Sequence, residues 1–213
     1  MLNDRVLSQI PSIAGKAIIE LGAGNGYFTP LLLRRFSGQA PSRIAITDQS
    51  QVLLDIAQSS FWIDGAEYLA LDVHDPFPFP DSSFHLVLAS MLFNELTTGA
   101  LHNALQEIHR ILVEDGCLIA TMPHPELVRA LAKKGALTDF GHGLSAMPGA
   151  EGLRLPVSRR PADAYRQMME ASGFAVLMED IYPDEKTLGE KPGLKVSQGT
   201  PLGLLCHCRR VAQ

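Results

Sequence analysis

Three glycines at alternate positions, Gly22, Gly24 and Gly26, follow a short apolar run that ends in the acid Glu20. Glycines at this spacing leave the backbone bare, so that a ligand can approach it closely. A dinucleotide-binding loop reads G-x-G-x-x-G, and its third glycine would fall where this chain has Tyr27. The spacing therefore favours a nucleotide-like ligand that has no diphosphate to bind.

Two further acids follow the next apolar runs in the same way. Asp48 comes after "RIAIT" and Asp72 comes after "YLAL". If these runs are parallel strands, then Glu20, Asp48 and Asp72 project at one edge of a sheet, where open α/β sheets bind their ligands. The sequence thus predicts an acidic, glycine-lined site at that edge.

The elements that must position these residues alternate along the chain. Short runs rich in β-branched residues predict strands at 17–21, 43–47, 67–71, 84–89, 117–122, 175–181 and 202–210. Amphipathic patterns predict helices at 28–36, 51–59, 101–112 and 162–172. The first five strands are apolar on both faces, which is typical of central parallel strands covered by helices on both sides. We therefore expect one doubly wound α/β domain that spans residues 1–213.

One segment, His124 to Arg160, interrupts this alternation. It has a short helix pattern at 125–134, with Pro125 near its start and Gly135 past its end, and then a stretch rich in glycine and proline. Insertions longer than about 15 residues are usually functional or mobile. Because it leaves the fifth strand at the ligand-binding edge, we interpret residues 124–160 as a lid-like insertion.

Composition excludes several classes of function. The 213 residues carry a net charge of −5 without a basic cluster, which disfavours a nucleic-acid partner. No window approaches the roughly 20 apolar residues of a membrane span, and we expect a soluble, cytoplasmic protein. The cysteines, Cys117, Cys206 and Cys208, have neither a disulfide pattern nor a C-x-x-C pair, so we predict buried thiols and no metal site.

The segment Glu20-Leu21-Gly22-Ala23-Gly24-Asn25-Gly26 resembles the first motif of the class I S-adenosylmethionine-dependent methyltransferases, in particular the small-molecule, type 11-like members. The stretch "DPFPFPDSSFHLVLAS" is similar to the loop and fourth strand of that family, with His85 in place of an acid. Val113 to Gly116 stands where relatives commonly have K-P-G-G. The resemblance implies a Rossmann-like sheet of seven mostly parallel strands, with the last strand antiparallel.

The resemblance also implies S-adenosylmethionine as the cofactor and a role for individual residues. Glu20 corresponds to the acid near the amino group of the cofactor, Asp48 to the acid that binds the ribose, and Asp72 to the acid near the adenine, with Val73 beside it. A carboxylate suits the ribose because it offers two acceptors at the spacing of a vicinal diol. The cofactor-binding residues implied are Glu20, Gly22, Ala23, Gly24, Asn25, Gly26, Asp48, Gln49, Asp72, Val73 and Ser90.

Catalysis requires fewer specific side chains than cofactor binding does, because the sulfonium of the cofactor already activates the methyl group. Holding the acceptor in line removes several kcal/mol of barrier, and a base is required only if the accepting atom starts protonated. His124 and Glu95 are the catalytic candidates at the carboxyl edge, with Asn94 and His142 as further possibilities. The N/D-P-P-Y signature of methyltransferases that act on amino groups of nucleic acids is absent, since Ser90-Met91-Leu92-Phe93 stands at that place.

Two functions follow from these patterns. The first is a methyltransferase for a small-molecule acceptor, with residues 124–160 and 182–199 closing over it. The second is a non-catalytic module that binds S-adenosylmethionine and uses the insertion to bind a partner. The intact motifs favour the enzyme, and the sequence leaves the acceptor and the oligomeric state open.

Overall fold

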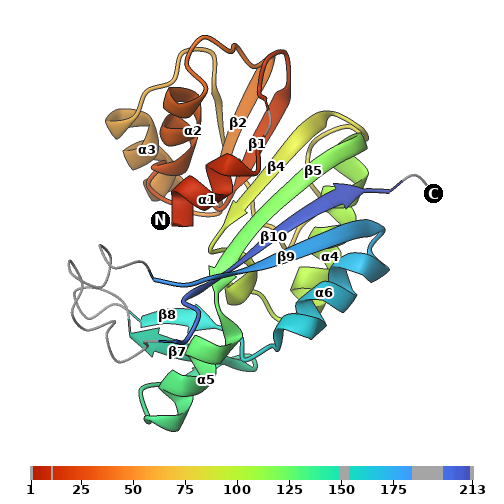
Figure 1. Cartoon of the computed structure of the whole chain (residues 1–213). Helices are drawn as coiled ribbons and strands as arrows, with labels where there is room; N and C mark the ends of the chain where they lie inside the picture. Colours follow the sequence, from red (N-terminus) through yellow and green to blue (C-terminus); the bar gives the residue numbers. More distant parts are fainter. Residues whose placement is uncertain (1, 11, 149–153, 184–198, 212–213) are drawn as a thin grey trace.

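The computed structural model describes residues 2–10, 12–148, 154–183 and 199–211. At the centre of these residues lies a seven-stranded sheet in the order β3-β2-β1-β4-β5-β10-β9 (Figure 1). Its strands are β1 (Ala17–Leu21), β2 (Arg43–Asp48), β3 (Glu67–Ala70), β4 (Phe84–Ser90), β5 (Leu112–Pro123), β9 (Phe174–Ile181) and β10 (Gly203–Arg210). Strands β1 to β5 pair in parallel, whereas β10 runs antiparallel to both β5 and β9. The expected fold class is confirmed.

Helices cover both faces of this sheet (Figure 1). They are α1 (Leu2–Ser8), α2 (Phe28–Arg35), α3 (Gln51–Ser60), α4 (Thr98–Ile111) and α6 (Ala162–Ala171). Helix α5 (Pro125–Lys133) belongs to the insertion, and a short 3-10 turn, η1 (Phe93–Glu95), follows β4. Buried side chains of α1 and α2 pack on one face, and those of α4 and α6 pack on the other. The sequence patterns predicted no helix at residues 2–8, so α1 is an addition.

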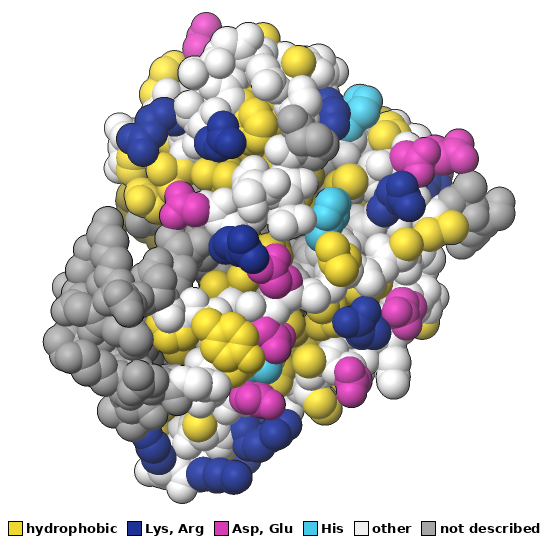
Figure 2. Space-filling view, in the orientation of Figure 1, with side chains coloured by type: hydrophobic (Ala, Val, Ile, Leu, Met, Phe, Trp, Pro, Cys, Tyr) yellow, Lys and Arg dark blue, Asp and Glu magenta, His cyan; other side chains and the backbone are white. Residues whose placement is uncertain are grey.

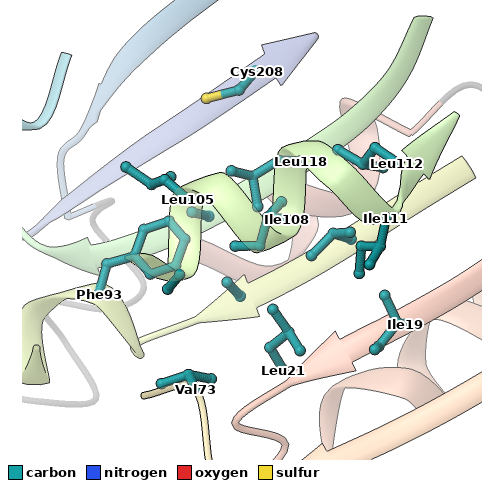
Figure 3. Packing of buried hydrophobic residues seen from close by; sticks show 14 of the residues in the cluster. Ile19, Leu21, Val73, Phe93, Leu105, Ile108, Ile111, Leu112, Leu118 and Cys208 are labelled. Atoms are coloured by element: carbon teal, nitrogen blue, oxygen red, sulfur yellow. The ribbon is translucent and has the colours of Figure 1, made fainter. Parts of the chain in front are cut away.

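Strand β1 shows how the two cores are separated. Ile18 packs in the cluster that contains Phe28 and Leu32 of α2, whereas its neighbours Ile19 and Leu21 pack in the cluster under α4. Successive strand residues point to opposite faces, so an uninterrupted apolar run is needed to bury both. Figure 3 shows α4 laid across the strands with its apolar stripe facing them. Each fully buried aliphatic side chain contributes about 1.5–3 kcal/mol to folding.

The thiols of β10 belong to this core. Cys206 and Cys208 are fully buried in the cluster under α4 and α6, whereas His207 between them is only half-buried. Burial raises the pKa of the Cys206 thiol to about 12, so it stays protonated. All three cysteines are free. The prediction that Cys206 and Cys208 are buried thiols is confirmed.

The insertion folds into a small unit of its own. After α5 it forms a second, antiparallel sheet of β6 (Thr138–Gly141), β7 (Leu144–Pro148) and β8 (Arg154–Val157), with β7 in the middle. The pattern predicted the helix to within one residue but gave no sheet. The unit lies beyond the carboxyl end of β5, below the main sheet in Figure 1. Of the second segment expected to close over an acceptor, residues 184–198 lie outside the described part.

Candidate active site

A cavity of about 510 Å³ opens at the carboxyl edge of the main sheet. Four segments that follow strands β1, β2, β3 and β4 contribute to its wall, and the small sheet of the insertion contributes the rest. Cavities of about 300–1,000 Å³ are typical of sites for cofactors and drug-sized molecules. The edge at which the sequence placed the ligand is therefore hollow.

The glycines of the loop after β1 serve different purposes. Gly24 has a φ of +55°, and a Cβ added there would meet no atom within 4 Å. Because Gly24 also lines the cavity, a side chain at this position would project into ligand space. Gly26 has a φ of +78°, but a Cβ there would come within 2.5 Å of the Cβ of Ala57 in α3. The missing side chain of Gly24 thus keeps the cavity open, whereas that of Gly26 makes room for the packing of α3.

Asp48, at the end of β2, is held by two backbone donors. The amide of Gly24 donates to Oδ2 at 2.8 Å and the amide of Ser50 donates to Oδ1 at 2.9 Å. Ser50 also caps α3, its hydroxyl accepting from the amide of Leu53. Each carboxylate oxygen has a second lone pair, and Asp48 lines the cavity. The carboxylate is therefore fixed in orientation and still able to accept from a ligand.

Asp72 is arranged differently from Asp48. Its Oδ1 accepts from the backbone and from Nδ1 of His74, at 2.9 and 2.6 Å, and these bonds hold the pKa of Asp72 below its usual range. The side chain is half exposed, and its neighbours Leu71, Val73 and His74 line the cavity instead. The third strand thus presents an apolar wall flanked by a histidine.

Glu20 is buried behind the loop. Only 2% of it is exposed, and its carboxylate accepts from the amide of Thr29 at 3.2 Å and from the Thr29 hydroxyl. Thr29 lies in the first turn of α2, where an acid stabilises the unpaired amides of the helix. Burial raises the pKa of Glu20 to about 7, although the bonds from Thr29 oppose the shift. In this arrangement Glu20 anchors α2 to β1.

Glu95 ends the 3-10 turn after β4 and faces the cavity. Burial raises its pKa to about 7, and the negative charge of Asp48 adds to the shift. A carboxyl group that titrates near neutral pH is suited to exchange protons with a bound molecule. The adjacent Asn94 is buried, and no protein partner reaches its Oδ1 among the described residues.

His124 caps helix α5. Its Nδ1 accepts from the amide of Glu126 at 3.1 Å, and its Nε2 lies 3.1 Å from Oδ1 of Asp180 on β9. Because both ring nitrogens have partners and the ring is buried, His124 holds the insertion against the sheet. It is not among the residues that line the large cavity. His142 is exposed in the β6–β7 turn.

The insertion contacts the cavity directly. Phe140, Leu144 and Pro156 line it opposite the strand ends. The amide of Ser158, just after β8, donates to the carbonyl of Asn94 at 2.7 Å, so the insertion is tied to the turn that carries Glu95. This apolar wall closes the side of the cavity that the main sheet leaves open.

The structure brings together only part of the set proposed from sequence. The proposed residues that line the cavity are Gly22, Gly24, Asp48, Gln49, Val73, Ser90 and Glu95; those that do not are Glu20, Ala23, Asn25, Gly26, Asp72 and His124. Residues in the wall that the sequence analysis did not name as site residues include Ser50, Leu53, His74, Met91, Leu92 and Leu96. Most of these residues lie two to six positions after the end of a strand, and from that position they could have been predicted as part of the site.

This sheet order, with a glycine loop after β1 and an acid at the end of β2, is that of the class I S-adenosylmethionine-dependent methyltransferases. Residues 18–116 match the family model described as a methyltransferase domain. The malonyl-[acyl-carrier protein] O-methyltransferase of Halorhodospira halophila is 27% identical over 208 residues, which cover 95% of this chain and 67% of that protein. Residues 18–116 therefore carry a methyltransferase domain of this class, and S-adenosylmethionine is its cofactor.

Solved structures share the whole fold. A structure from Mesorhizobium loti described as an S-adenosylmethionine-dependent methyltransferase has a TM-score of 0.74 and 19% identity, covering 97% of this chain and 96% of that one. A structure from Listeria monocytogenes described under the same class has a TM-score of 0.78 and 16% identity, covering 98% and 96%. The overlap extends well beyond the matched domain.

Two negative findings apply to the described residues. None of the helices there is both long and apolar enough to span a membrane. Nowhere in the same part of the chain do three His, Cys, Asp or Glu side chains come together in a way that could bind a metal ion.

Proposed function

We propose that this methyltransferase methylates an oxygen, specifically a hydroxyl, of a small neutral acceptor held between the carboxyl edge of the sheet and the insertion. The observation that carries the proposal is Glu95, a half-buried carboxyl group in the cavity wall with a pKa of about 7. When bound, S-adenosylmethionine supplies an electrophilic methyl group on a sulfonium. The chain must then hold the cofactor, orient the acceptor and remove its proton.

The first task falls to the loop after β1 and to Asp48. The two backbone bonds to Asp48 fix the plane of its carboxylate, so that the remaining lone pairs can accept both ribose hydroxyls. Bare backbone at Gly24 leaves room for the methionine part. Val73 and Leu71 supply the apolar surface on which an adenine ring can lie.

The proton goes to Glu95 in this proposal. A hydroxyl must lose its proton as the new bond to carbon forms, and an ionised carboxylate whose pKa is close to the working pH is an efficient acceptor for it. Asp48 lies near enough for its charge to help raise the pKa of Glu95. Glu95 therefore lies on the side of the cavity that carries Asp48, the proposed ribose ligand.

The charge of the cavity favours a neutral acceptor. No lysine or arginine lines it among the described residues, while Asp48 and Glu95 do. The basic side chains of α5 gather instead on the outer surface of the insertion, at the lower end of the molecule in Figure 2. The overall charge of −5 also favours a small molecule over nucleic acid. The relative from Halorhodospira is named for a malonyl acceptor, and a carboxylate would meet repulsion here.

The insertion contributes the remaining wall, which supports the interpretation of residues 124–160 as a lid of a single domain. Three free cysteines, two of them buried, support a cytoplasmic location, because thiols stay reduced there. No feature of the described residues favours the alternative of a non-catalytic binding module.

The test is the pH dependence of turnover. Release of S-adenosylhomocysteine is measured with a panel of phenols, 1,3-diketone enols and carboxylic acids. With a hydroxyl acceptor, kcat should rise through a pKa near 7 as Glu95 ionises. Glu95→Gln should lower kcat about 10²- to 10⁴-fold and abolish its rise with pH near 7. Asp55→Asn, on the exposed side of α3, should change neither kcat nor its pH dependence.

Turnover of carboxylic acids alone, with kcat falling as pH rises through 7, would contradict the proposal. In that case protonated Glu95 would be donating a hydrogen bond to an ionised acceptor. A Glu95→Gln enzyme with the full rate and an unchanged profile would remove Glu95 from the chemistry.

A further inference from the structure

A second cavity of about 160 Å³ adjoins the first, and it is apolar. Met91 lines both cavities and forms their common wall. The other residues that line the second cavity come from parts of the chain that are far apart in sequence. They lie at the end of β5, in helix α5, in strand β7, and in or next to strands β9 and β10. The side chains that this inference uses are Met91, Met122, Leu127, Met147, Ile181 and Leu202.

The backbone at Met91 is held in an unusual conformation. Its φ is +60°, a region that residues other than glycine rarely adopt. The amide of Met91 donates to the carbonyl of Thr121 at 2.7 Å, which fixes the turn against β5. Strain of this kind persists where the surrounding structure requires it, and it gathers at functional sites. Here it sets the Met91 side chain at the junction between the two cavities.

We propose that the apolar cavity binds an unbranched aliphatic portion of the methyl acceptor. The inference rests on the proposed function, because it places the reacting oxygen in the large cavity near Glu95 and the chain beyond Met91. No charged residue lines the second cavity among the described residues. Three of its side chains are methionines, which adapt to flexible chains. The cavity of about 160 Å³ corresponds to roughly five water-sized groups of about 30 Å³ each, so it has room for a chain of about five carbons.

The first experiment measures binding without turnover. The protein is labelled with ¹³C in its methionine methyl groups and saturated with S-adenosylhomocysteine, and straight-chain 1-alkanols from ethanol to decanol are titrated in. Signals of Met91, Met122 and Met147 should shift, while those of Met168 and Met169 in α6 should not. Affinity should rise about fourfold per carbon, which corresponds to about 0.8 kcal/mol per methylene. It should level off near six carbons, about five in the apolar cavity and one that joins them to the hydroxyl.

The second experiment changes the size of the cavity at one position. Leu127→Ala should move the preferred chain length up by two or three carbons, and Leu127→Trp should move it down by at least as much. Leu131→Ala and Leu131→Trp, one helical turn further along α5, are matched controls because Leu131 lines neither cavity. Opposite shifts from two substitutions of one residue cannot arise from general damage to the fold.

Affinity that does not depend on chain length, or shifts in all methionine signals alike, would overturn the inference. The inference would also be overturned if the alkanols did not bind to a protein that still binds S-adenosylhomocysteine. Failure of the proposed function looks different: chain-length selectivity would remain, but no hydroxyl acceptor would be methylated, or Glu95→Gln would keep the full rate. Failure of the inference and failure of the proposed function can therefore be told apart.

Discussion

The two walls of the active site are built in contrasting ways. The wall proposed for the cofactor consists of residues at or just after the ends of β1, β2 and β3, and backbone amides hold its central carboxylate, Asp48, at 2.8 and 2.9 Å. The wall proposed for the acceptor is apolar and is assembled from α5, β7, β9 and β10. The first wall is fixed by hydrogen bonds within one sheet edge, and the second is fixed by packing between separate units.

Because of this difference, we expect ligand binding to respond to substitutions in two different ways. A hydrogen-bonded carboxylate or a bare glycine tolerates almost no change, because a lost acceptor or an added Cβ acts directly on the ligand. An apolar pocket responds gradually, because each methylene adds or removes only a fraction of the binding free energy. We therefore expect substitutions in the first wall to abolish binding and substitutions in the second wall to change selectivity.

The largest effect is expected at Gly24. Gly24→Val places a β-branched side chain in the cavity at a φ of +55°, so binding of S-adenosylhomocysteine should fall below detection, by more than about 100-fold. Gly15→Val is the control, because Gly15 has a φ of +65° and equally open surroundings but does not line the cavity. Isothermal titration, with circular dichroism for the fold, measures the contrast. Normal binding by folded Gly24→Val would show that this loop does not contact the cofactor.

Glu20 should make the free energy of unfolding depend on pH. Its pKa is about 7 in the folded protein and 4.5 when unfolded, so the unfolded chain loses its proton first as pH rises. The free energy of unfolding should fall between pH 4.5 and 7 and then level off, a loss of roughly 3 kcal/mol from this group. Glu20→Gln should remove this loss and be more stable than the parent at pH 8, but not below pH 4.5.

Urea unfolding at a series of pH values measures this effect. Glu107→Gln is the control of opposite sign, because Arg110 lowers the pKa of Glu107 and the native acid stabilises the protein above pH 4.5. The affinity of Glu20→Gln for S-adenosylhomocysteine then tests the role that the resemblance implies. A drop in affinity supports a contact with the cofactor, and an unchanged value limits Glu20 to the anchoring of α2.

Asp48→Ala should weaken cofactor binding about 10- to 100-fold, since charge-assisted hydrogen bonds are each worth roughly 1.5–3 kcal/mol. Asp48→Asn keeps the shape and should lose less, while Asp55→Ala on the exposed surface of α3 should lose nothing. Titration calorimetry of the three variants gives the ranking. Equal affinity in all of them would remove Asp48 as the ribose ligand.

The smallest effect concerns the insertion. Phe140, Leu144 and Pro156 line the cavity, so a bound cofactor should hold the insertion closed and slow cleavage by trypsin at Lys133 and Lys134 several-fold. An unstructured peptide in the same reaction controls for inhibition of the protease. Identical cleavage rates with and without S-adenosylhomocysteine would show that the insertion packs in one position and does not respond to the ligand.

The fold and the cofactor wall could be predicted from the sequence because both depend on local patterns. The strands of the main sheet and the helices that cover it were predicted to within about three residues, apart from β5 and from α1, which was not predicted. This strand begins at Leu112 instead of residue 117, because an irregularity in its pairing with β4 extends it backwards. Asp48 and Gly24 could be placed because their positions follow from where strands end.

The acceptor wall could not be predicted, because its residues meet only in three dimensions. The small sheet was missed although a signal was present: His142-Gly143 joins β6 to β7, and both residues have positive φ, which is typical of a tight hairpin turn. The flanking strands are short and partly polar, so their alternation is weak. The conformation of Met91 has no signature in sequence at all.

The position of β10 has a consequence for how the chain assembles. β9 pairs with the sheet only through β10, which inserts between β5 and β9 and comes last in the described chain. During synthesis, β5 must therefore keep an unpaired edge until β10 has left the ribosome, and exposed edges of this kind invite aggregation. Since Ile181 and Leu202 line the apolar cavity, that cavity can be completed only after the segment that leads into β10 has been synthesised.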